Sequence, residues 1–64
     1  MRHGTVDRLI SRADALREEA QEWRALAAEG HALADEFADL AALAEAAAEA
    51  FEAVAGRLVP AAAE

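Results

Sequence analysis

The sequence predicts an all-α fold, an antiparallel hairpin of two helices over about residues 5–29 and 32–58, within one domain spanning residues 1–64. Alanine, the residue with the highest helix propensity, supplies about a third of the chain. Apolar residues recur at alternating spacings of three and four on both sides of Gly30. These two repeats do not share one heptad register across Gly30, which favours a turn there over a continuous helix.

The first helix is predicted to begin at Thr5, whose hydroxyl can accept a hydrogen bond from a free amide of the first turn. Asp7 follows where the helix dipole favours a negative charge. With heptad positions lettered a to g, Val6 takes position a and Leu9 takes position d. The same repeat continues through Ala13, Leu16, Ala20, Trp23 and Ala27. Residues 1–4 are expected to be frayed.

Gly30 stands where a helix would be capped, because glycine adopts the left-handed backbone conformation without a Cβ clash. Two features oppose a turn at this point. His31 and Ala32 are not typical turn residues, and the nearest N-cap candidate, Asp35, lies beyond Leu33. An interior glycine costs a continuous helix only about 1 kcal/mol. One long helix in an antiparallel coiled coil therefore stays open as the alternative.

The second helix is predicted to end near residues 56–59, because Pro60 cannot continue a helix and disfavours helical backbone at Val59. Residues 60–64 are expected to be frayed. Its heptad places Phe37, Ala44, Phe51 and Leu58 at a, and Leu33, Leu40, Ala47 and Val54 at d. The predicted core therefore consists of Val6, Leu9, Leu16, Trp23, Leu33, Phe37, Leu40, Phe51, Val54 and Leu58.

Position e of the second helix is a row of four alanines, Ala34, Ala41, Ala48 and Ala55. A helix that is small or apolar around much of its circumference is usually buried on more than one side. A chain of 64 residues without cysteine also needs a partner more often than a larger domain does. We expect the hairpin to dimerise into a four-helix bundle, with the alanine row and Trp23, Phe37 and Phe51 at the interface.

The net charge of −7 is concentrated in the second half of the chain. Arg12, Arg17 and Arg24 flank the apolar repeat of the first helix, where they can meet carboxylates of another helix or chain. Glu45, Glu49 and Glu52 are the corresponding partner-facing acids of the second helix. Nucleic acid is not an expected partner, because the first helix also carries Glu18, Glu19 and Glu22.

No residue pattern predicts an enzyme, a cofactor or a metal site. His31 and Asp35 share a helical spacing, but zinc needs three or four ligands. Ser11 has no histidine at helical reach that could act as its base. Glu45, Glu49 and Glu52 interrupt the most apolar stretch, so a membrane span is not expected, and the N-terminal residues do not predict a signal sequence. A cytoplasmic location follows as an expectation.

The predicted function is that of a non-enzymatic module for oligomerisation or protein–protein interaction. The alternative is an acidic regulator or inhibitor, similar in action to an antitoxin, that binds a basic site on a partner protein. The composition, rich in alanine and with arginine as the sole basic residue besides histidine, is typical of a GC-rich, bacterial genome.

Overall fold

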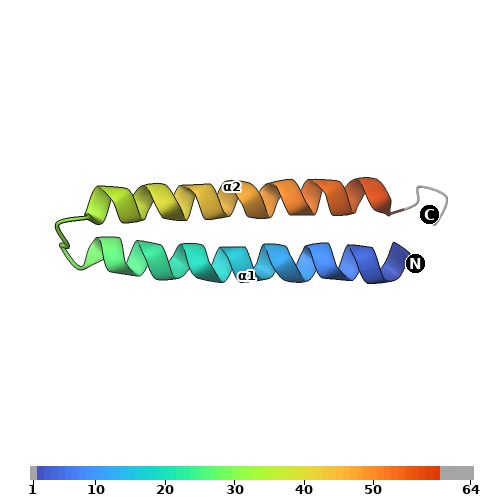
Figure 1. Ribbon diagram of the computed structural model, residues 1–64, viewed down its shortest axis with the longest axis horizontal. Coiled ribbons are helices and arrows are strands. Elements are labelled where there is room, and N and C mark those ends of the chain that lie inside the picture. The colour runs from blue at the N-terminus through green and yellow to red at the C-terminus, as the bar shows by residue number, and fades with distance from the viewer. Residues whose placement is uncertain (1, 60–64) are drawn as a thin grey trace.

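A computed structural model of the chain describes residues 2–59. Two helices, α1 (Arg2–Ala28) and α2 (Ala34–Leu58), lie side by side and run in opposite directions (Figure 1). The longest dimension of the molecule is 50 Å, whereas one continuous helix over residues 2–58 would be about 85 Å long at ~1.5 Å per residue. The antiparallel hairpin is therefore confirmed, and the continuous helix is wrong.

The first helix begins earlier than predicted. α1 starts at Arg2, so Thr5 lies inside the helix and Asp7 lies beyond its first turn. The residues before Thr5 include no proline, so the backbone can extend the helix by most of one turn. The predicted start at Thr5 is wrong, and the segment expected to be frayed is helical from Arg2 onward. Met1 and residues 60–64 lie outside the described residues.

The turn depends on Gly30, which has a φ of +73°. No other residue type within residues 2–59 has a positive φ, because a Cβ makes the left-handed conformation costly. The Glu29 N–H donates to the Leu26 carbonyl at 3.2 Å, and the Ala34 N–H donates to the His31 carbonyl at 3.0 Å. The chain thus reverses within residues 29–33, and the predicted role of Gly30 is confirmed.

The second helix begins without a side-chain cap. Leu33 is its N-cap residue, and α2 starts at Ala34, two residues later than predicted. The Leu33 N–H donates a long hydrogen bond of 3.5 Å to Nδ1 of His31 within the turn. Asp35 and Glu36 lie in the first turn, where their negative charges interact favourably with the helix dipole and stabilise the helix.

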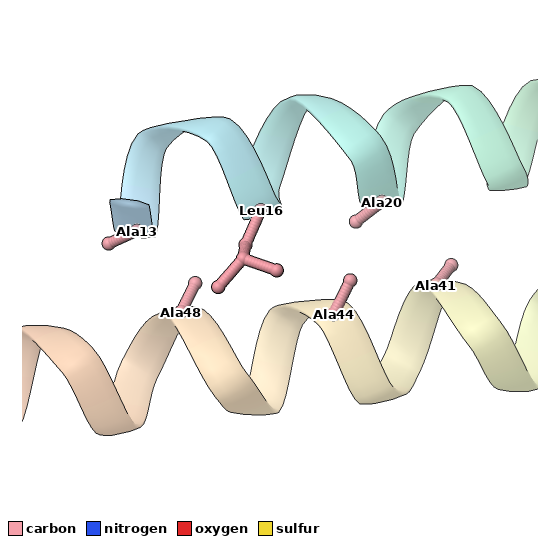
Figure 2. Close-up of a cluster of buried hydrophobic side chains, with 6 residues drawn as sticks. All are labelled: Ala13, Leu16, Ala20, Ala41, Ala44 and Ala48. Carbon is pink, nitrogen blue, oxygen red and sulfur yellow. The ribbon is translucent and has the colours of Figure 1, made fainter. Parts of the chain in front are cut away.

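The core is a narrow seam of small side chains between the helices. Ala13, Leu16 and Ala20 of α1 face Ala41, Ala44 and Ala48 of α2, and the Leu16 side chain extends between Ala44 and Ala48 (Figure 2). All six side chains are buried, and four of them are at most 1% exposed. The predicted a/d seam of α1 is confirmed, since Ala13 and Ala20 occupy a and Leu16 occupies d.

The buried face of α2 is rotated about the helix axis relative to the predicted face. Its buried residues, Ala41, Ala44, Ala48 and Ala55, occupy positions a and e. Leu33 and Leu40 at d are 48% and 39% exposed, so their assignment to the core is wrong. The remaining predicted core residues other than Leu16 are half-buried. Alanine at e lets the two backbones approach closely, and this close packing turns the larger d residues out of the seam.

Candidate protein interaction surface

The two long edges of the hairpin differ in chemistry. One edge, called here the ion-pair edge, carries Arg17 and Arg24 of α1 opposite Glu52 and Glu45 of α2. These arginines occupy heptad position e of α1, and the glutamates occupy position b of α2, beside the buried alanines. Because e and g lie on opposite sides of an a/d seam, the g positions of α1 belong to the other edge.

Both ion pairs are bidentate. Nη2 and Nε of Arg17 lie 2.5 and 3.2 Å from the two carboxylate oxygens of Glu52. Arg24 contacts Glu45 with the same two distances. The hydrogen bonds from the arginines hold the pKa of Glu52 and the pKa of Glu45 below the usual glutamate value, and partial desolvation opposes that shift. The ion-pair edge is thus closed by contacts within one chain.

This geometry places four of the six predicted partner-facing charges against each other. Arg17, Arg24, Glu45 and Glu52 meet across the seam of their own hairpin. Arg12 and Glu49 are exposed and make no ion pair within the described residues. The individual pairs could not be predicted from the sequence, because they depend on which face of α2 contacts α1.

The opposite edge is apolar and open to solvent. This apolar edge is defined by the apolar residues at positions d and g of α2, with two residues of α1 beside them: Leu33, Leu40, Leu43, Ala47, Ala50 and Val54, with Trp23 and Leu26. Position g also holds the charged residues Glu36 and Arg57, one near each end of α2. Leu43 is 67% exposed, the largest value among the exposed large apolar residues. Among the side chains of residues 4–59 no ion pair spans this edge.

The two helices still meet along the apolar edge. Leu9 of α1 lines a shallow hollow together with Ala50, Phe51 and Val54 of α2, and no polar residue takes part in that lining. Phe51 is half-buried and packs against the core. The apolar edge is therefore a continuous strip of side chains from both helices, partly sunk into the seam and partly exposed.

Trp23 anchors the apolar edge near the turn. Its ring lies 5.5 Å from that of Phe37, which lies 5.2 Å from the His31 ring. The indole N–H donates to Glu19 at 3.2 Å, which satisfies its only polar group. Trp23 of α1 and Phe37 of α2 therefore contact each other within one hairpin. Both side chains are half-buried, so part of their surface remains available to a partner.

The predicted alanine row lies inside the hairpin. Ala41, Ala48 and Ala55 are between 0% and 2% exposed, and Ala34 is half-buried. In this conformation α1 covers Ala41, Ala48 and Ala55, so a second chain cannot contact these three. The exposed residues Leu40 and Leu43 were not predicted as surface residues. Three leucines at d and g beside a complete alanine row at e are the sequence signal that could have revealed them.

Other kinds of site find little support among residues 2–59. No group of three or more histidine, aspartate or glutamate side chains there could hold a metal ion. Neither described helix is long and apolar enough to cross a membrane. No family model, no curated protein and no solved structure matches this chain.

Proposed function

We propose that this protein is a non-enzymatic oligomerisation module, and that a second copy of the chain covers its apolar edge. The observation that carries the proposal is the exposure of Leu43, Leu40 and Leu33 along one edge. The core of the same hairpin is built almost entirely of alanine. Contiguous exposed apolar residues of this kind mark interaction surfaces on soluble proteins.

The energetics of the single hairpin support a partner. No large side chain of the described residues is fully buried, so the seam captures little of the apolar surface that the sequence contains. Complete burial of one leucine side chain contributes about 1.5–3 kcal/mol. Small domains have only a few kcal/mol of net stability. Leu33, Leu40 and Leu43 are between 39% and 67% exposed, so covering the three together would contribute about 2–5 kcal/mol before the entropic cost of association is subtracted.

The alternative function, an acidic regulator of a basic partner, has a weaker basis. Its support is the net charge of −7. However, Glu45 and Glu52, two of the three acids proposed to face the partner, are already bonded to Arg24 and Arg17. Salt separates the two functions, because apolar association persists in 0.5 M salt whereas association through exposed charges is screened.

The experiment compares matched substitutions on the two edges. Leu43→Gln removes a large apolar side chain from the apolar edge, and Ile10→Gln removes one that is 42% exposed on the ion-pair edge. We expect the wild-type chain to dimerise at micromolar concentration in sedimentation equilibrium. Leu43→Gln should weaken the dimer at least tenfold, and Ile10→Gln should leave it unchanged. A wild-type chain that stays monomeric up to millimolar concentration would disprove the proposal.

A further inference from the structure

The residues at positions d and g of α2 form a stripe along the helix, and this stripe has opposite charges at its two ends. Position g of α2 holds Glu36, Leu43, Ala50 and Arg57 at intervals of seven residues, so all four lie along one line of the helix surface. Glu36 lies in the first turn and Arg57 in the last turn of α2. The stripe is therefore acidic at the turn end of the hairpin and basic at the end where α1 begins.

Within the part of the chain that the structure describes, these two charges have no partner. Neither Glu36 nor Arg57 takes part in an ion pair or a side-chain hydrogen bond among the described residues. They are 21 residues apart on one helix, which separates their backbones by about 32 Å at ~1.5 Å per residue. A direct contact between them is possible only when they belong to two different molecules.

We propose that two copies dock α2 against α2 in antiparallel orientation, with their Ala47 residues adjacent and Glu36 of each copy paired with Arg57 of the other. This inference rests on the proposed oligomerisation through the apolar edge. It adds the orientation of the second copy and the residues that determine it.

In this antiparallel dimer the stripe of the second copy runs in the opposite direction, with Ala47 at the centre of both stripes. Complementary residues then lie opposite each other. Leu40 comes to lie opposite Val54 of the second copy, and Leu43 opposite Ala50. Each contact thus joins a larger side chain to a smaller one, as close packing requires. The same reversal brings Glu36 opposite Arg57 at both ends of the stripe. Such flanking charges determine the orientation of paired helices more than their stability.

The parallel arrangement is disfavoured by like charges. Arg12 lies five residues before Arg17, and Arg57 lies five residues after Glu52. Because Arg17 and Glu52 are bonded across the seam, Arg12 and Arg57 lie at the same level of the hairpin. Arg12 occupies position g of α1, on the apolar edge. A parallel dimer would bring arginines of the two copies together, whereas the antiparallel dimer brings Glu36 to this end.

Charge reversal tests the orientation. Glu36→Arg leaves a chain with arginine at both ends of the stripe, and Arg57→Glu leaves one with glutamate at both ends. We expect each variant alone to dimerise at least tenfold more weakly than the wild-type chain, because like charges meet at both contacts. An equimolar mixture of the two variants should form a heterodimer by native mass spectrometry. Its dissociation constant should return to within about threefold of the wild-type value.

A matched control removes the effect of the helix dipole. Asp35→Arg changes the same first turn of α2, but at position f, away from the apolar edge. It should leave the dimer within about twofold of the wild-type value. Circular dichroism establishes that each variant keeps its helix content.

Two outcomes separate this inference from the proposed function. If the wild-type chain dimerises, Leu43→Gln disrupts the dimer and the two charge variants do not prefer each other, the orientation is wrong and the apolar-edge dimer stands. If the wild-type chain is monomeric at every concentration, both proposals are overturned, and a different protein becomes the candidate occupant of the apolar edge.

Discussion

Gly30 is the residue at which the chain begins to reverse its direction. Its positive φ of 73° lets the chain leave α1 in the left-handed conformation that reverses its course. Gly56, in contrast, lies inside α2 and has no positive φ. A Cβ built at either glycine meets no atom within 4 Å. The two positions thus differ in backbone conformation and not in available space.

This difference predicts opposite effects of the same substitution. Gly30→Ala should destabilise the hairpin by about 1–2 kcal/mol, because alanine is strained in the left-handed region. Gly56→Ala should stabilise it by about 0.5–1 kcal/mol, because alanine has the higher helix propensity. Urea unfolding of both variants at one protein concentration measures the two changes. Equal effects of the same sign would contradict the assigned turn.

At the scale of the helices, two kinds of contact join α1 to α2. Small side chains at the seam allow close approach, and Arg17–Glu52 and Arg24–Glu45 bridge one edge. The bridging side chains are between 39% and 51% exposed, so solvent screens their attraction. Their contribution is expected to orient the helices more than to stabilise them.

The ion pairs predict a specific dependence of stability on pH. The pKa values of Glu45 and Glu52 are lower in the folded chain than the ordinary value of 4.5. A carboxylate of this kind stabilises the fold above its ordinary pKa, and the contribution is lost as the pH falls through the lowered value. The wild-type chain should therefore be more stable than the Glu45→Gln/Glu52→Gln variant at pH 7, and this advantage should disappear towards pH 3.

Urea midpoints at pH 7, 5 and 3 provide the test. The Arg17→Gln/Arg24→Gln variant is the control, because it removes the donors and should lose the same pH-dependent advantage. A difference between wild type and the glutamine variants that is as large at pH 3 as at pH 7 would show that these ion pairs are not its source.

At the scale of the whole molecule, the hairpin is a rod 50 Å long and about 15 Å wide in its other two dimensions. One side of the rod is closed by ion pairs, and the other carries the leucines of the apolar edge. Under the proposed function, a second copy lies along the length of the rod and covers the apolar edge.

Small-angle scattering should detect that arrangement. An antiparallel dimer of hairpins keeps its longest dimension near that of one hairpin, below about 70 Å when side chains are included. A pair of continuous helices would exceed about 85 Å at ~1.5 Å per residue. A maximum dimension in the longer range, with a dimeric mass, would contradict the hairpin in solution.

Much of the fold follows from local sequence. Alanine content and the spacing of apolar residues predict both helices, and Gly30 predicts the turn. The Trp23–Phe37 contact follows because the two residues flank that turn. The predicted start of α1 at Thr5 is too late because a residue that can cap a helix also fits inside one, and α1 begins at Arg2.

Backbone propensities and one apolar repeat are sufficient to predict the two helices, their turn and the buried face of α1. Which face of α2 contacts α1 depends instead on how the two helices pack against each other. Positions a, d and e of α2 all hold residues that can be buried, so the helix has more than one acceptable face. Close approach of alanines at a and e selected one of them, because small side chains pack backbones together, and this left the leucines at d and g exposed.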